Sequence, residues 1–179
     1  MRKYNITIIL AFCMLFTGCA DPVEDGTSLL EEGKYEEARE KFETAIEKEK
    51  NLGEAYLGLG ICSWEAEDYE AAKKHLGLAL ENGAKESGTL YHLLGQCEME
   101  MECPEKAVYY FENGQELSGA GKELLKEMAY NLVVAYEKAG DYQTAKKKLE
   151  SYLKANPDDK KALKEQEFLN TQISEGNQQ

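Results

Sequence analysis

Small and large apolar residues recur along the chain at helical spacing, separated by short polar segments. Ala38, Phe42 and Ala45 lie at offsets of four and seven residues, which place them on one face of a helix. The same arrangement returns near residues 72–79, 107–114 and 145–152, and an apolar segment precedes each of these three. The pattern therefore predicts pairs of amphipathic helices joined by tight turns.

The helix pairs repeat with a fixed period. One column of the repeat reads Ala38, Ala72, Ala107 and Ala145, with spacings of 34, 35 and 38 residues. Columns that begin at Tyr35, Phe42 and Ala45 give the same three spacings. We therefore predict an all-α solenoid of about four helix-turn-helix units, because a repeat of this length buries its apolar face only by stacking on its neighbours. The units are expected at about residues 25–52, 53–86, 88–121 and 126–159.

The turns within the units follow from single residues. Gly33 and Gly140 stand just past the first helix of their units, where a left-handed backbone closes a helix at little cost. Glu67 and Glu102 occupy this place in the middle units, so those two turns should be less ideal. Pro104 can begin a helix without losing a hydrogen bond.

A terminal helix is expected to close the stack. Residues 158–173 present Ala162, Leu163 and Leu169 on one side among lysines and glutamates, so this segment should cap the exposed end of the solenoid. Residues 174–179 are polar and are expected to form a flexible tail.

The repeated residues resemble the tetratricopeptide repeat, whose pattern has Leu-Gly in its first helix and Ala, Phe and Ala in its second. The matches include Leu59, Gly60, Ala72 and Ala79 in the second unit, Leu94, Gly95, Ala107 and Phe111 in the third, and Tyr136, Gly140, Tyr142, Ala145 and Pro157 in the fourth. The resemblance covers about residues 24–159. It implies an α-solenoid that binds proteins or peptides, and it names no single function.

The start of the chain has the parts of a secretory signal. Arg2 and Lys3 precede an apolar run from Ile6 to Phe16 that only Thr7 interrupts, and small residues follow. A helix of this length, at about 1.5 Å per residue, covers roughly half of the hydrocarbon core of a bilayer. Residues 1–18 are therefore expected to be a cleaved signal peptide.

The end of this run, Leu15-Phe16-Thr17-Gly18-Cys19, resembles the lipobox of bacterial lipoproteins. The resemblance implies cleavage before Cys19, a diacylglyceryl group with fatty acids such as palmitate on its sulfur, and a linker over residues 19–24. The mature protein would then be anchored on the extracytoplasmic side of a cell membrane. An ordinary secreted protein cleaved near Gly18, or an uncleaved leader, is the alternative.

Charge excludes one class of partner. The chain has 34 Asp and Glu against 21 Lys and Arg, a formal net charge of −13, and no basic stripe reverses this locally. Since such a chain repels phosphate backbones, nucleic-acid binding is not expected.

The sequence offers no set of catalytic or metal-binding residues. After Cys13 and Cys19, three cysteines remain, Cys62, Cys97 and Cys103, and their places in the repeats are too far apart for a disulfide. With only two histidines, no closed zinc site can be drawn, and neither a phosphate-binding glycine loop nor a Ser/His/Asp set is present. We expect no enzyme activity, metal or cofactor.

Surface recognition is the remaining chemistry. In a tetratricopeptide stack the first helices line a concave groove, and register selects the residues that face it. The predicted groove residues are Glu54, Leu57, Ile61, Trp64, His92, Gln96, Met99, Glu127, Tyr130, Val134 and Glu137. Trp64 could instead be a wedge between neighbouring repeats.

These residues predict a non-catalytic adaptor that buries an apolar or aromatic peptide stretch with basic flanks, since acidic groove residues select Lys or Arg. The predicted positions hold no Lys, Arg or Asn, which disfavours a ligand with a free acidic C-terminus. Two alternatives stay open: a scaffold that docks by its edges in an envelope machine such as a pilus or secretion system, and an accessory protein that contacts cell-wall glycan.

Overall fold

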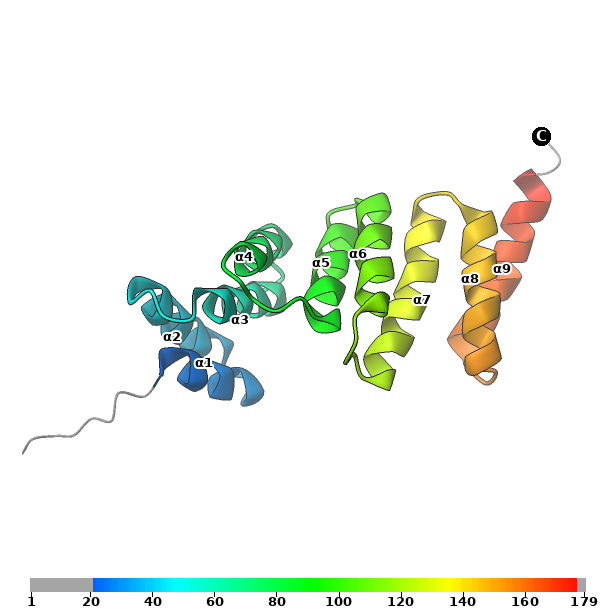
Figure 1. The fold of residues 1–179 in the computed structure, drawn as a ribbon. Helices are drawn as coiled ribbons and strands as arrows, with labels where there is room; N and C mark the ends of the chain where they lie inside the picture. Colours follow the sequence, from blue (N-terminus) through cyan, green and yellow to red (C-terminus); the bar gives the residue numbers. More distant parts are fainter. Residues whose placement is uncertain (1–20, 177–179) are drawn as a thin grey trace, which may run out of the picture.

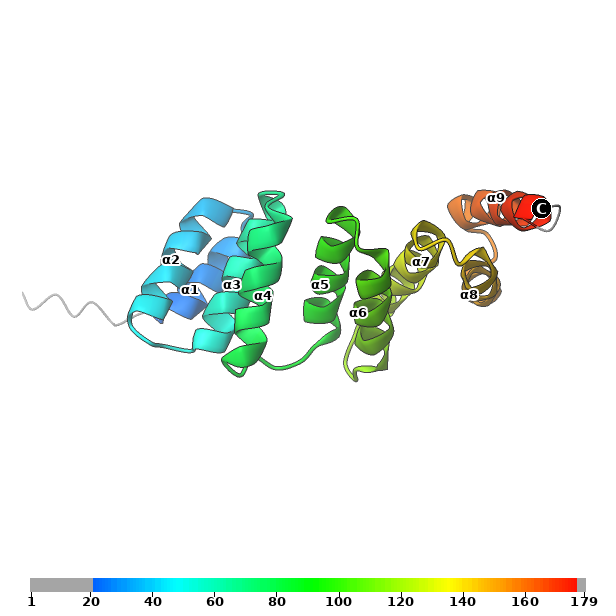
Figure 2. The ribbon, with the colours of Figure 1, turned by 90° about the horizontal axis from the view of Figure 1, so that it is seen from above.

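The computed structural model of the chain describes residues 21–176, and this part consists of helices and the turns between them. Figure 1 shows the helices packed in one row, from the blue N-terminal pair to the red C-terminal helix, and Figure 2 shows the same row from above. The nine helices of the described part are α1 Pro22–Glu31, α2 Tyr35–Glu47, α3 Leu52–Glu65, α4 Tyr69–Glu81, α5 Gly88–Glu100, α6 Pro104–Glu116, α7 Lys122–Lys138, α8 Tyr142–Ala155 and α9 Lys160–Gly176. The predicted all-α solenoid of helix pairs is confirmed.

Small residues let the two helices of each pair approach closely. The repeated alanines on the second helices, at positions 38, 72, 107 and 145, are fully buried. At Gly60 in α3, a β-carbon would lie only 2.7 Å from Leu76 Cδ2 in α4, and at Gly95 in α5 it would overlap the ring of Phe111 in α6. A larger side chain at either glycine would therefore push the paired helices apart.

The turns inside the units have the backbone that the sequence predicts. Gly33 and Gly140 have φ values of 72° and 80°, in the left-handed region. Glu67 and Glu102 adopt the same region, with φ values of 59° and 56°. Since a side chain there costs roughly 1–2 kcal/mol, the two middle turns are the less ideal ones.

Helix starts differ slightly from the expected boundaries. Pro22 is the first residue of α1, and the side chain of Asp21 caps this helix by accepting a hydrogen bond from Val23 N at 3.0 Å. The helix thus begins inside the segment expected to be a linker, because proline at the first helical position loses no hydrogen bond. Pro104 begins α6 in the same way.

The last helix, α9, packs against α8 and buries Ala162 and Leu169 completely. Leu163 was expected on the same side, and this was wrong, because 42% of its surface is exposed. Leu163 follows Ala162 directly, so it lies about 100° around the helix from the buried side. The helix continues to Gly176, beyond the expected end at Ile173.

A charged pair lies in the joint between α4 and α5. Lys73 Nζ is 2.7 Å from Glu98 Oε1, and the side chain of Glu98 is only 1% exposed. The second carboxylate oxygen of Glu98 is buried and has no hydrogen-bond partner among the described residues. The joint between α4 and α5 therefore contains an ion pair whose carboxylate is buried.

Candidate functional site

A pocket of about 240 Å³ opens on the first helices of successive units. We call it the inner pocket. It is lined by Trp64, Tyr69, Gln96, Met99, Glu100, Phe111, Tyr130, Asn131, Val134, Lys138 and Lys161. Five of these were predicted as groove residues: Trp64, Gln96, Met99, Tyr130 and Val134. Because they come from α3, α5 and α7, the structure brings together side chains from three separate units.

Trp64 packs between units and also lines the inner pocket. Its ring is half-buried and packs against the core cluster that α4 and α5 share, which includes Leu76 and Leu90. It also lines the inner pocket, and its indole Nε1 is buried without a hydrogen-bond partner among the described residues. An indole N–H without a partner is costly in a protein interior, so the position of this ring reduces stability unless it gains an acceptor.

Three residues of the inner pocket that sequence reasoning missed are hydrogen-bond donors: Asn131, Lys138 and Lys161. Lys161 Nζ lies 4.6 Å from the centre of the Tyr130 ring. The Tyr130 hydroxyl donates to Glu165 Oε2 at 3.4 Å, and burial, followed by Glu165, raises the pKa of this tyrosine. The predicted groove positions lacked Lys and Asn, but the pocket itself contains both.

His92 lies in the core, whereas the groove prediction placed it on the surface. It is 6% exposed, and its Nε2 is 3.1 Å from Asn131 Nδ2 and 3.7 Å from Glu127 Oε1. Burial lowers the pKa of the ring, and Glu127 opposes this effect. A neutral ring accepts the Asn131 amide hydrogen at Nε2, so His92 positions Asn131 from behind the pocket.

Four other predicted residues do not line the inner pocket. Glu54 and Glu127 are exposed, while Leu57 and Ile61 are half-buried. Leu57 packs against the same core cluster as Trp64. Leu57 and Trp64, which the groove prediction placed on one surface, therefore both take part in packing between units.

Glu137 is half-buried beside a second carboxyl group. Burial, and then Glu165 of α9, raise the pKa of Glu137 to about 8. Glu137 Oε1 is buried and has no hydrogen-bond partner among the described residues. Burial and the neighbouring carboxyl group both favour the protonated form of Glu137.

The cysteines of the described part are free thiols. Cys62 and Cys97 are buried, and burial raises the pKa of each to about 11, so they are inert core residues. Cys103 is partly exposed, and its thiol donates to the carbonyl oxygen of Met101 at 3.4 Å. Cys19, the predicted lipidation site, lies outside the described residues.

One serine and one histidine come close enough for a hydrogen bond. Ser63 Oγ is 3.1 Å from His75 Nδ1, a contact that the sequence did not indicate. Ser63 is fully buried, and burial lowers the pKa of His75. A substrate cannot reach this hydroxyl, so the contact is part of the packing between α3 and α4.

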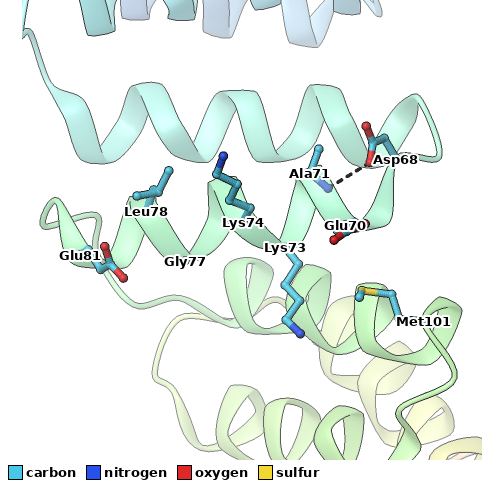
Figure 3. A pocket seen from close by; sticks show the side chains of 9 residues that line it. All are labelled: Asp68, Glu70, Ala71, Lys73, Lys74, Gly77, Leu78, Glu81 and Met101. Carbon is cyan, nitrogen blue, oxygen red and sulfur yellow. Dashed lines mark hydrogen bonds between the residues drawn. The ribbon is translucent and has the colours of Figure 1, made fainter.

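The largest hollow, of about 770 Å³, lies along α4 and apart from the inner pocket. Figure 3 shows Lys73 and Met101 on the side of the following helices, and Lys74 and Leu78 on the opposite side of α4. Gly77 lies between them with open space around it. Apart from Met101, every lining residue belongs to α4 or to its cap at Asp68, so this surface does not join several units.

The described residues contain neither a candidate membrane span nor a candidate metal site. No helix within residues 21–176 is both long and apolar enough to cross a bilayer. In the same part of the chain, His, Cys, Asp and Glu side chains do not gather in groups of three that could hold a metal ion.

Comparison with known structures gives the same architecture. YrrB, described as a TPR protein with an unusual peptide-binding site, is 22% identical, with 86% of this chain and 76% of that chain covered and a TM-score of 0.76. MamA from Desulfovibrio magneticus RS-1 is 18% identical, with 86% of each chain covered and a TM-score of 0.73. A comparison with curated protein sequences gave no match. At these identities the likeness concerns the fold.

Two family models, both described as tetratricopeptide repeat, match residues 29–97 and 127–159. The first match begins in α1 and ends in α5, and the second includes most of α7 and all of α8. The matched segments and the stacked helix pairs together show that this chain contains tetratricopeptide repeats arranged as an α-solenoid.

Proposed function

We propose that the chain is a non-catalytic adaptor, anchored outside the cytoplasmic membrane, that binds a segment of another protein along its first helices. The inner pocket carries this proposal, because it gathers Trp64, Met99 and Tyr130 from three units around one hollow. Tetratricopeptide proteins bind peptide or protein partners, and the peptide-binding site named for YrrB supports the same use of this fold.

The pocket chemistry suits an apolar or aromatic side chain of the ligand. Trp64, Met99 and Val134 supply apolar contact, and buried aromatic anchors dominate the energy of such interfaces. Asn131, Lys138 and Lys161 also line the pocket and bring side-chain hydrogen-bond donors to it. Glu54 and Glu127, which are exposed on α3 and α7, select basic residues on either side of the anchor.

Photocrosslinking in cells tests the binding surface. A photoreactive amino acid at Gln96, which lines the pocket, should crosslink to one protein partner, and the same group at exposed Lys106 on α6 serves as the matched control. Equal crosslinking from both positions, or crosslinking from neither, would contradict the proposal that a partner binds at the inner pocket.

The two alternatives give different products in the same experiment. A scaffold that docks by its edge should crosslink from Phe168 of α9, which is 46% exposed, and remain silent at Gln96. A glycan-binding accessory protein should give adducts with cell-wall fragments rather than with a protein. Either result would replace the adaptor proposal.

A further inference from the structure

A separate pocket of about 300 Å³ lies where the end of α6, the first half of α7 and the last turns of α8 meet. These three helices are neighbours in Figures 1 and 2. We call it the lysine pocket. It is lined by Gln115, Lys122, Leu125, Lys126, Ala129, Leu132, Lys148, Ser151, Tyr152, Ala155 and Asn156. It shares no residue with the inner pocket.

The charge of this pocket is opposite to that of the chain. Three lysines line it and no Asp or Glu does, although the chain has a net charge of −13. The four other pockets found in residues 21–176 each combine lysines with carboxylates. The lysine pocket is therefore lined by lysines alone among the charged residues, and the nearest carboxylates lie beyond its lining, at Glu112 and in the adjoining pocket with Glu123, Glu127 and Asp159.

Two of the three lysines in this pocket form no ion pair within the described part of the chain. Within the described residues, neither Lys122 nor Lys126 has a carboxylate oxygen within 4.0 Å, whereas Lys148 Nζ is 2.8 Å from Glu112 Oε1. Lys126 also borders the adjoining pocket that contains Asp159. Gln115 lines the same pocket, and its Nε2 is buried without a hydrogen-bond partner among the described residues. The unpartnered donors point to a ligand that supplies acceptors.

The position of Lys122 is unfavourable for folding. It is the first residue of α7, where the helix dipole favours acidic side chains and disfavours a cation. A residue that breaks a local rule without a structural gain often serves a function. Here the lysine side chain lines the pocket beside Lys126, one turn further along the same helix.

We propose that the lysine pocket binds a phosphate group. Lysine ammonium groups act as point charges that suit a tetrahedral phosphate, whereas a planar carboxylate is matched better by arginine, which the pocket lacks. Its volume equals about ten water molecules at ~30 Å³ each, enough for a phosphate and a few carbons. Leu125, Ala129 and Leu132 provide an apolar wall for those carbons. The phosphate can belong to a free small molecule or to a lipid headgroup.

Titration of the full chain, followed by NMR of its backbone amides, tests the site at constant ionic strength. The two probes are inorganic phosphate and dihexanoyl phosphatidic acid below its micelle concentration. We expect saturable shifts at Lys122, Lys126 and Ser151. Tighter binding of the lipid identifies a headgroup as the source, and equal binding identifies a free phosphate.

The variant Lys122→Gln/Lys126→Gln should weaken binding of the probe by roughly tenfold or more, as expected for loss of charge-assisted hydrogen bonds. The variant Lys50→Gln/Lys106→Gln removes the same charge from exposed positions outside the described pockets. Its affinity for the probe should stay within about twofold of that of the natural chain. All four lysines are exposed, so both variants should fold, which circular dichroism checks. Equal losses in the two variants, or no saturable binding of either probe, would overturn the proposal.

Discussion

At the scale of single residues, Trp64 both packs against the core and lines the inner pocket. Its half-buried ring packs against the core that α4 and α5 share, so Trp64→Ala should lower the free energy of unfolding by about 2 kcal/mol, below the 3–5 kcal/mol typical of a fully buried ring. Urea unfolding followed by circular dichroism measures this change, because the variant has no other tryptophan to report fluorescence.

Trp64→Phe is the matched control for this experiment. It keeps an aromatic ring in the same place and removes the unpartnered indole N–H, so its stability should remain close to that of the natural chain. A Trp64→Ala variant as stable as the natural chain would show that the ring does not pack in the joint.

At the scale of helices, the sequence predicts the pairs and their turns well because small local signals determine them. A repeated alanine at a crossing, or a glycine in the left-handed region, is a local requirement that periodicity reveals. The burial of His92 and the position of Lys161 over Tyr130 depend on how one unit rotates on the next. No fixed spacing along the chain reveals contacts of this kind. The groove prediction therefore included five residues that line the inner pocket and left out its lysines.

The joint between α4 and α5 should depend strongly on Lys73. Lys73→Met leaves the Glu98 carboxylate, which is 1% exposed, without its partner, and removal of one member of a buried pair costs about 3–5 kcal/mol. Because the side chain of Lys73 is 31% exposed, we expect a loss near the lower end of this range. Thermal and urea unfolding measure it.

The double variant Lys73→Met/Glu98→Leu is the informative comparison. It replaces both charges by apolar groups of similar length, so it should recover most of the stability that Lys73→Met loses. If the double variant is no more stable than the single one, the unpaired carboxylate is not the cause of the loss.

Helix α9 should make stability depend on pH. The pKa of Glu137 is raised to about 8 in the folded chain and returns to about 4.5 on unfolding, so the folded chain binds more protons between these values. Stability should therefore fall as the pH rises from about 4.5 to 8. We expect the free energy of unfolding to decrease by on the order of 1 kcal/mol, since solvent reaches the half-buried carboxyl groups of Glu137 and Glu165 and screens their interaction.

Substitution of Glu137 by Gln isolates this effect. The amide keeps the shape of the protonated carboxyl group and does not ionise, so urea unfolding of Glu137→Gln should vary less between pH 5 and pH 8. The carboxyl group of Glu165, which acts on Glu137 from α9, remains in the variant. An unchanged pH profile would show that another group titrates.

At the scale of the whole molecule, the proposed anchor at Cys19 decides where the repeats operate. A single acyl chain binds a membrane only weakly and reversibly, whereas a diacylglyceryl cysteine carries at least the two chains that stable anchoring requires. Cys19→Ala should therefore move the protein from the membrane fraction to soluble fractions, or leave an unprocessed precursor. Since Cys19 precedes the first helix, the variant should unfold at the same temperature as the natural chain. Intact mass at the mature N-terminus gives an independent reading, and an unmodified Cys19 in the natural protein would contradict the anchor while leaving the repeat domain and both pockets as described.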